Sequence, residues 1–147
     1  MIYTALTKKA MKVAYEAHHG QTDRSGLPYI FHPFYVSEQM DDEFSVCTAL
    51  LHDVVEDTEV SFENLEKEFP AEIVEALRYL TRDKSMNYFD YIRNLRKNPI
   101  AKKVKRADLL HNSDVTRLTD CEDISERQIS RLHGRYKRAL EILSETG

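Results

Sequence analysis

The sequence contains few of the residues that break, staple or tightly bend a chain. Its 147 residues include 4 Gly, 4 Pro, 2 Cys and no Trp. Cys47 and Cys121 are too few for a disulfide framework and lack the spacing of metal-binding cysteines. Strand-like alternation is also hard to find, whereas apolar residues recur at helical spacing. These absences exclude a disulfide-stapled fold and favour an all-α one.

Long apolar runs and targeting signals are absent too. No apolar run approaches the roughly 20 residues that cross a bilayer, and residues 1–5 do not form the basic and apolar regions of a secretory signal. We therefore expect a cytoplasmic location and no membrane partner. The formal net charge of −4 at pH 7 argues against nonspecific nucleic-acid binding, so no nucleic-acid partner is expected. The length is most simply one domain, residues 1–147.

Helical periodicity and capping signals predict about seven or eight helices. Proline suits the first turn of a helix, and serine suits the position just before it. The predicted helices cover about residues 4–18, a short stretch after His32-Pro33, about 42–55, the stretches that follow Ser61 and Pro70, about 87–96, the stretch from Pro99 through Asp108, and a last one opened by the capping-box pattern of residues 125–128. The expected fold class is all-α.

The stretch 42–55 is apolar nearly all round, so we expect it at the centre of the fold. It contains His52 and Asp53, which would be costly to bury without partners, and a metal ion is the most economical partner. On a continuous helix His52 would lie below Glu56, and Asp53 below Asp57. Their place near the helix C-terminus would raise the pKa of both later carboxyls, which suits a general acid or base. About equally, these two acids could simply end a helix in solvent.

Two further groups complete a metal site on paper: His32 and Asp108. Two His and two Asp suit Mn²⁺, Fe²⁺ or Zn²⁺, and the absence of Cys ligands argues against a closed structural zinc site. Water at an open position of such an ion has a lowered pKa and becomes a nucleophile at neutral pH. His111 and Asn112 share the helix face of Asp108, so either can contact a substrate or support the ligands.

A basic stretch without any acid leads up to Asp108. Its members are Arg93, Arg96, Lys97, Lys102, Lys103, Lys105 and Arg106. A charge run of this kind is often a solvated helix face. Because this one adjoins a candidate metal ligand, attraction of phosphate is about equally compatible with it.

The last predicted helix carries one apolar stripe. Its members are Ile129, Leu132, Tyr136, Leu140 and Leu143. A core-facing helix explains such a stripe better than a coiled-coil or dimer seam does. The chain is therefore expected to be a monomer or a homodimer.

The order His…His-Asp…Asp resembles the HD superfamily of metal-dependent phosphohydrolases. A longer set of motifs resembles the hydrolase domain of the RelA/SpoT family, particularly its small stand-alone alarmone hydrolases. These motifs are residues 17–21 (AHHGQ), 25–33 (SGLPYIFHP), 49–58 (ALLHDVVEDT), 61–69 (SFENLEKEF) and 104–112 (VKRADLLHN). The resemblance extends from residue 17 to about 118 and implies a single compact HD-domain helical bundle.

The resemblance also implies roles for particular residues. It implies that Mn²⁺, with Fe²⁺ or Zn²⁺ as alternatives, is bound by His32, His52, Asp53 and Asp108, that the attacking water is positioned or activated by Glu56 and Asp57, and that the substrate is contacted by Arg24, Ser25 and Asn112, with His111 beside them. The implied substrate is a phosphorylated guanine nucleotide. The implied reaction removes the 3′-pyrophosphate of ppGpp or pppGpp, the nucleotides of the stringent response, and leaves GDP or GTP.

Three residues depart from the family pattern. Asp23 stands where a basic residue is usual, Leu109 replaces a basic residue, and Val115 falls where a nucleotide-contacting Thr is common. The metal ligands are unaffected, but the nucleotide pocket is altered. Two alternatives therefore stay open: a phosphohydrolase of another nucleotide, such as a nucleoside monophosphate or the phosphate of NADPH, or a non-catalytic nucleotide-binding module.

Overall fold

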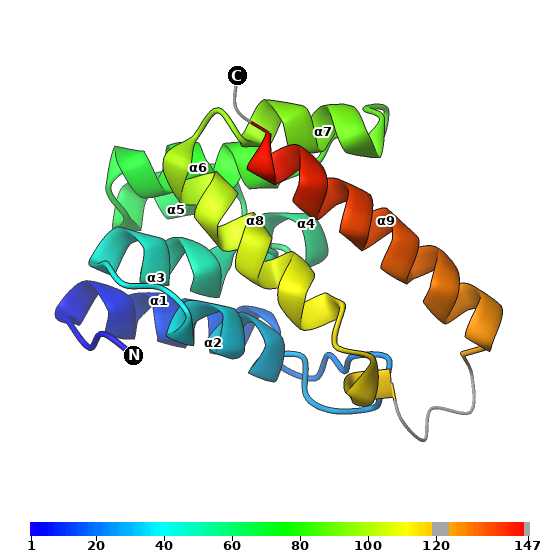
Figure 1. Ribbon diagram of the computed structural model, residues 1–147. Coiled ribbons are helices and arrows are strands. Elements are labelled where there is room, and N and C mark those ends of the chain that lie inside the picture. The colour runs from blue at the N-terminus through cyan, green and yellow to red at the C-terminus, as the bar shows by residue number, and fades with distance from the viewer. Residues whose placement is uncertain (119–123, 146–147) are drawn as a thin grey trace.

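The computed structural model describes residues 1–118 and 124–145. Over these ranges the chain forms nine α-helices, one 3₁₀ helix (η1) and no strand, which confirms the all-α prediction (Figure 1). No helix in the same ranges is long and apolar enough to span a membrane. The elements are α1 Ala5–Ala17, α2 Phe31–Glu38, α3 Glu43–Leu51, α4 Val54–Asp57, α5 Phe62–Glu68, α6 Ala71–Leu80, α7 Tyr88–Leu95, α8 Pro99–Asn112, η1 Val115–Leu118 and α9 Glu126–Ser144.

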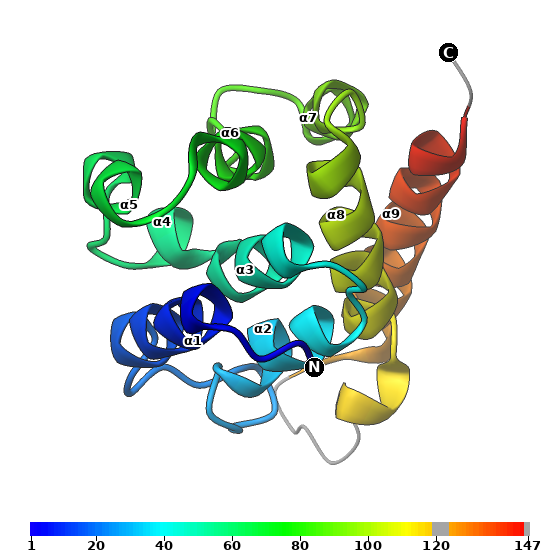
Figure 2. The same cartoon turned by 90° about the vertical axis from the view of Figure 1, so that its left-hand side faces the viewer.

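Helix α3 lies at the centre of the bundle. It packs against α1, α2, α6 and α8, and every residue from Ser45 to Leu51 is buried. Figure 2 shows α1 and α2 on one side of α3 and α5 and α6 on the other, with α8 and α9 beside them. The central position predicted for the apolar stretch is confirmed. It places the C-terminal end of α3, where the His-Asp pair begins, inside the fold.

Most helix starts follow from local hydrogen bonds that the sequence indicates. The side chain of Ser61 accepts a hydrogen bond from the backbone N–H of Asn64, and Ser125 does the same with Gln128, so both predicted caps are present. Pro70 is the cap residue of α6, and Pro99 is the first residue of α8. These starts need no partner from elsewhere in the chain, which is why the sequence indicates them.

The predicted continuous helix over 42–55 is wrong at the His-Asp pair. Helix α3 ends at Leu51, and Asp53 has φ −105° and ψ 2°, outside the helical region, before the short α4 begins. His52 and Asp53 therefore lie in a bend between two helices, while Glu56 and Asp57 lie in α4, where the backbone N–H of Asp57 still donates to the carbonyl oxygen of Asp53 at 3.0 Å. No Gly or Pro marks this bend, and the apolar periodicity runs straight through it.

The apolar stripe of α9 serves two purposes. In the C-terminal half of the helix Ala139, Ile142 and Leu143 are buried in the core, as expected for a core-facing helix. Nearer the N-terminal end Leu132 and Tyr136 instead line a surface cavity. In Figure 1 this end of α9 extends away from the bundle. The stripe therefore builds part of a pocket wall, which the sequence pattern did not indicate.

Candidate metal centre and substrate pocket

The four candidate metal ligands lie together at the bend after α3. Ligand atoms of His32, His52 and Asp53 all lie within 4.8 Å of one another. Oδ1 of Asp108 lies 2.7 Å from Nε2 of His32 and 3.5 Å from Nε2 of His52. His32, His52 and Asp108 are buried. Helices α2, α3 and α8, which pack against one another, thus bring together residues far apart in the sequence.

The hydrogen bonding of His52 tests whether these residues fit a metal ion. Its Nδ1 lies 2.6 Å from the carbonyl oxygen of Ala49, which can only accept, so Nδ1 carries the proton and donates. In the neutral ring, Nε2 then presents a lone pair, and this buried atom has no hydrogen-bond partner. It faces Oδ2 of Asp53 at 3.0 Å and Oδ1 of Asp108 at 3.5 Å. Acceptors that converge in this way require a cation, and the donor set fits a divalent metal.

The shift in the pKa of His52 also shows that the two carboxylates favour a positive charge at this position. Burial lowers this pKa, but the carboxylates of Asp53 and Asp108 raise it, and together they hold it well above its ordinary value. A proton or a metal ion would satisfy the same field. The centre is therefore built to hold positive charge between two carboxylates.

Residues around the ligands fix their orientation. The hydroxyl of Tyr29 donates to Oδ2 of Asp53. On Asp108, Nζ of Lys105 lies 3.0 Å from Oδ2, and Nδ2 of Asn112 donates to Oδ1 at 3.1 Å. No role was predicted for Tyr29, and Lys105 was predicted only as part of the basic stretch. Signals were available: Tyr29 lies in the motif of His32, and Lys105 precedes Asp108 by three residues on one helix.

His111 supports a ligand and does not line the cavity. Its Nδ1 lies 2.7 Å from Nδ1 of His32, and the two rings are stacked with an interplanar angle of 3°. The ring of His111 also stacks on Tyr35, at 4.0 Å between ring centroids. Burial, then Arg117 and His32, lower the pKa of His111 to about 4. A neutral His111 can accept the Nδ1 proton of His32, which leaves Nε2 of His32 available as a ligand.

Glu56 and Asp57 adjoin the ligand cluster through Asp53. One carboxylate oxygen from each of these three residues lies within 4.8 Å of the others. Oε1 of Glu56 accepts a hydrogen bond from the backbone N–H of Arg82 at 3.0 Å. Both side chains reach solvent, yet partial desolvation, followed by the charge of Asp53, raises the pKa of each carboxyl. The raised direction agrees with the prediction from the sequence, and burial is its largest cause.

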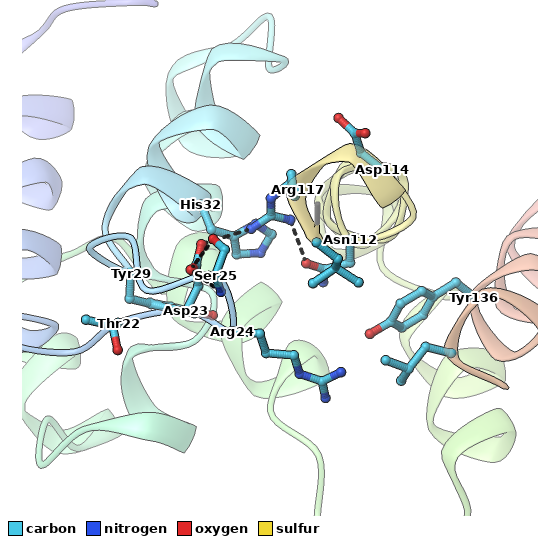
Figure 3. Close-up of a pocket in the computed structure, with 12 residues that line it drawn as sticks. Thr22, Asp23, Arg24, Ser25, Tyr29, His32, Asn112, Asp114, Arg117 and Tyr136 are labelled. Atoms are coloured by element: carbon cyan, nitrogen blue, oxygen red, sulfur yellow. Dashed lines mark hydrogen bonds and ion pairs between the residues drawn. The ribbon is translucent and has the colours of Figure 1, made fainter. Parts of the chain in front are cut away.

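A cavity of about 320 Å³ opens beside the metal centre. This volume is at the lower end of the range for small-molecule sites. Figure 3 shows Arg24 reaching from its loop toward the side where α9 carries Tyr136. Residues from four parts of the chain line the cavity, among them Arg24, Ser25, His32, Asn112, Arg117 and Tyr136. Of the predicted substrate-binding residues, Arg24, Ser25 and Asn112 therefore line the cavity.

Asp23 organises the loop before the first ligand. Its Oδ1 accepts hydrogen bonds from the backbone N–H and hydroxyl of Ser25, at 2.9 and 2.7 Å, and from the backbone N–H of Leu27 at 3.0 Å. The turn also places Gly26 at φ 85°, a conformation that other residues rarely adopt. The Ser25 hydroxyl is thus committed to the loop, so the departure at Asp23 shapes the pocket wall.

Arg117 supplies a cation at the cavity that the sequence analysis did not identify. Its Nη2 lies 3.7 Å from Oδ2 of Asp23, and its Nη1 donates to Oδ1 of Asn112 at 3.1 Å (Figure 3). Leu109, another of the three departures from the family pattern, does not line the cavity, because it is buried in the hydrophobic core. No sequence signal marked Arg117, since it lies beyond the motif that contains Asn112.

Comparison with known proteins agrees with this fold and site. The profile of the HD domain family matches residues 10–128. The chain therefore belongs to the HD domain family. This match includes all four candidate metal ligands and both later carboxylates.

Named relatives identify the branch of this family. The zebrafish (Danio rerio) "Guanosine-3′,5′-bis(diphosphate) 3′-pyrophosphohydrolase MESH1" is 35% identical over an alignment of 130 residues, and the match covers 79% of this chain and 72% of that protein. A solved structure described as "A metazoan ortholog of SpoT hydrolyzes ppGpp and plays a role in starvation responses" superposes with a TM-score of 0.85 at 28% identity, covering 100% of this chain and 90% of the other. The resemblance to RelA/SpoT-type hydrolase domains is confirmed.

Other relatives are much longer than the matched region. "Putative GTP diphosphokinase RSH1, chloroplastic" of Arabidopsis thaliana is 47% identical over 72 residues, 45% of this chain but 8% of that protein. "Bifunctional (p)ppGpp synthase/hydrolase SpoT" of Escherichia coli is 36% identical over 87 residues, 56% of this chain and 12% of that protein. The chain thus corresponds to a small part of these relatives.

Proposed function

We propose that this protein hydrolyses the 3′-pyrophosphate of ppGpp or pppGpp and releases GDP or GTP together with pyrophosphate. The observation that carries the proposal is the unpartnered Nε2 of His52, which faces two carboxylates. It lies in a buried cluster with His32, whose ring also lines the cavity. The activities named for the zebrafish MESH1 relative and the metazoan structure are of the same kind.

The ligand set that we propose for the metal ion is His32, His52, Asp53 and Asp108, with Mn²⁺ as the ion and Fe²⁺ or Zn²⁺ as alternatives. When bound, a divalent ion supplies charge neutralisation at phosphorus and acidifies water. Lys105 and Asn112 fix the orientation of the Asp108 carboxylate, so this proposed ligand is already oriented before a metal ion binds. The location in the cytoplasm and the monomeric or homodimeric state stay predictions.

Glu56 and Asp57 are placed to handle the proton of the attacking water. Their raised pKa brings each carboxyl closer to the pH at which it can both take up and release a proton. The Arg82 backbone N–H holds Oε1 of Glu56, so the second oxygen of that carboxylate is the one available for a proton. We assign both residues to water activation.

The cavity would hold the nucleotide. Arg24 and Arg117 provide positive charge on its wall, and the Asn112 side chain stands between the cavity and Asp108. Ser25 contributes to the wall mainly through its bonds to Asp23. His111 acts on the substrate indirectly, through His32.

A second candidate is the same chemistry on another phosphorylated nucleotide, such as a nucleoside monophosphate or the phosphate of NADPH. The observation that favours it is the carboxylate of Asp23 beside Arg117, which partly neutralises a cation of the cavity wall. A cavity wall with less positive charge favours a substrate with fewer phosphates, compared with a wall in which the charge of Arg117 is not neutralised.

Adding metal back to stripped protein tests the proposal. Metal-free protein is incubated with ppGpp, with and without Mn²⁺, and products are separated by ion-exchange chromatography. We expect rapid Mn²⁺-dependent release of GDP and pyrophosphate. If ppGpp stays intact while nucleoside monophosphates or NADPH lose phosphate, the second candidate replaces the first. Nucleotide binding without turnover of any of these would instead indicate a non-catalytic module.

A further inference from the structure

Three cationic side chains surround the ring of Tyr88, outside the cavity described above. Cζ of Arg135 lies 3.7 Å from the ring centroid, Cζ of Arg82 lies 5.5 Å away and Nζ of Lys105 lies 5.9 Å away. We call these four residues the Tyr88 cluster. They come from the loop before α7, the first turn of α7, and helices α8 and α9. None of them is among the residues that line the Arg24 cavity.

The Tyr88 cluster is joined to the metal centre at two points. Lys105 holds Oδ2 of Asp108 at 3.0 Å, while the other oxygen of this carboxylate faces the two histidines. The backbone N–H of Arg82 holds Oε1 of Glu56. A group bound at the cluster would therefore lie beside both a metal ligand and a catalytic carboxylate.

The charges of the cluster are only partly compensated. Lys105 is paired with Asp108, and the Arg82 guanidinium donates two hydrogen bonds to the carbonyl oxygen of Met86, which is uncharged. Within the described part of the chain Arg135 has no carboxylate partner, and its recorded contact is the face of Tyr88. The hydrogen bonds of Arg82 stabilise the loop before α7. Arg135 is held by its stack on Tyr88, which leaves its positive charge unneutralised by any carboxylate of the described residues.

Stacking on an aromatic ring keeps a guanidinium in place while leaving its N–H donors free to bind. Guanidinium groups bind phosphate through paired, charge-assisted hydrogen bonds. The acidic groups nearby are Asp53, Glu56, Asp57 and Asp108, so a phosphate group approaching the centre needs additional positive charge. Arg82 and Arg135 are placed to supply it.

We propose that the Tyr88 cluster is a subsite for the outer phosphate of the diphosphate that leaves during the reaction. The proposal rests on the proposed function and assigns the two ends of the substrate. The nucleotide occupies the Arg24 cavity, the bond to be cleaved lies at the metal centre, and the departing diphosphate reaches Arg82 and Arg135. A substrate with a single phosphate at the scissile position has no outer phosphate to place beside Arg82 and Arg135.

Binding of inorganic pyrophosphate tests the subsite without turnover. Protein carrying one equivalent of Mn²⁺ is titrated calorimetrically with pyrophosphate and, separately, with orthophosphate. The variants are Arg135→Gln and Arg82→Gln, with Arg82→Lys to restore the charge at the loop. The matched control is Arg138→Gln on the same helix, because Arg138 pairs with Glu141 and Glu145 away from the cluster. Circular dichroism checks that each variant is folded.

We expect Arg135→Gln and Arg82→Gln each to weaken pyrophosphate binding about tenfold, as for the loss of a charge-assisted hydrogen bond. Orthophosphate binding should change less than about twofold, because orthophosphate can bind at the metal without reaching the cluster. Arg82→Lys should recover part of the loss. Equal pyrophosphate affinities in all proteins would overturn the subsite, and so would an equal loss in Arg138→Gln, which would indicate a general electrostatic field.

The two proposals can fail separately. If the wild-type protein binds pyrophosphate through both arginines but does not cleave ppGpp, the subsite stands and the proposed function fails. If ppGpp is cleaved but both Gln variants bind pyrophosphate as the wild type does, the function stands and the subsite fails.

Discussion

The metal centre and the wall of the Arg24 cavity are built in different ways. In the centre His32, His52 and Asp108 are buried, Asp53 lies partly exposed at the bend between α3 and α4, and neighbouring side chains or a carbonyl hold each of the four. The cavity wall consists largely of a loop, the short η1 helix and the outer half of α9, and His32 of α2 and Asn112 at the end of α8 complete it. The centre belongs to the core of the protein, whereas the wall belongs to its surface.

This difference separates chemistry from specificity. A change at the centre disturbs charges that cannot be replaced by water, so its effect should be large. A change in the wall disturbs contacts that solvent can partly replace. Of the three departures from the family pattern, Asp23 lies in this wall and Leu109 lies in the core. The comparison predicts effects that decrease from the centre outward.

The largest effect is expected for His52→Ala. This variant removes the lone pair that faces Asp53 and Asp108, so we expect turnover of ppGpp and tight Mn²⁺ binding both to be lost. Release of pyrophosphate and metal content per protein measure the two losses. His19→Ala, which changes an exposed histidine, is the control. Retained turnover in a folded, metal-loaded His52→Ala protein would contradict the proposed centre.

Glu56→Gln and Asp57→Asn should separate proton handling from metal binding. Each change removes a carboxylate with a raised pKa and leaves all four proposed metal ligands in place. We therefore expect kcat to fall by roughly 10²–10⁴-fold while the affinity for Mn²⁺ is retained. Steady-state kinetics and metal titration measure these two quantities. Loss of metal binding in either variant would place that residue among the ligands.

Asp23→Ala should act on the cavity wall. It removes the carboxylate oxygen that accepts three hydrogen bonds within the loop, and it removes the ion pair with Arg117. We expect KM to rise roughly 2- to 10-fold while kcat stays within about twofold. Asp23→Asn keeps the loop acceptor and should have a smaller effect. A fall in kcat with unchanged KM would show that the loop acts on the reaction itself.

Asp42→Ala should have the smallest effect on activity. Asp42 caps α3 at the end opposite the His-Asp pair, accepting from the backbone N–H of Ser45 at 2.8 Å and from Lys103 at 2.8 Å. The free energy of unfolding should fall by about 1 kcal/mol, with kcat unchanged. Urea unfolding measures it. Asp41→Ala, which removes only an exposed contact to Lys103, should cost less than about 0.5 kcal/mol.

The stability contributed by Asp42 should depend on pH. Partial burial raises its pKa, but hydrogen bonds from Lys103 and Ser45 and the charge of Lys103 lower it below its ordinary value. A carboxyl with a lowered folded-state pKa stabilises the protein above the unfolded-state pKa of about 4, and this contribution is lost as the pH falls through the folded-state pKa. The difference between the wild type and Asp42→Ala should therefore shrink below about pH 4. A difference that is constant down to pH 2 would contradict the assignment.

The helical organisation could be predicted from the sequence to a large extent. The caps at Ser61 and Ser125 and the helix start at Pro99 depend on hydrogen bonds and sterics within one turn. The proposed ligand set was indicated by residue type and by family resemblance. The bend at Asp53 was missed, because apolar periodicity reports which residues are buried and does not report that two ligands must turn toward a third helix.

The supports of the site were harder to predict. The pairing of Arg117 with Asp23 and the cation stack on Tyr88 join segments that share no local pattern. The pairing of Lys105 with Asp108 is local, because the two residues lie three positions apart on α8, but the place of Lys105 beside the ring of Tyr91 depends on how α7 and α8 pack.

The sequence by itself determined the class of fold, the ends of most helices and the kinds of ligand atoms available. These properties depend on interactions between residues at most about four positions apart. Only the tertiary structure decided that Nε2 of His32 lies 2.7 Å from Oδ1 of Asp108, although the two residues are 76 positions apart in the sequence. It also decided where α3 bends and which residues line the cavity. The free energy for those arrangements comes from packing helices against one another, and that packing depends on the whole chain at once.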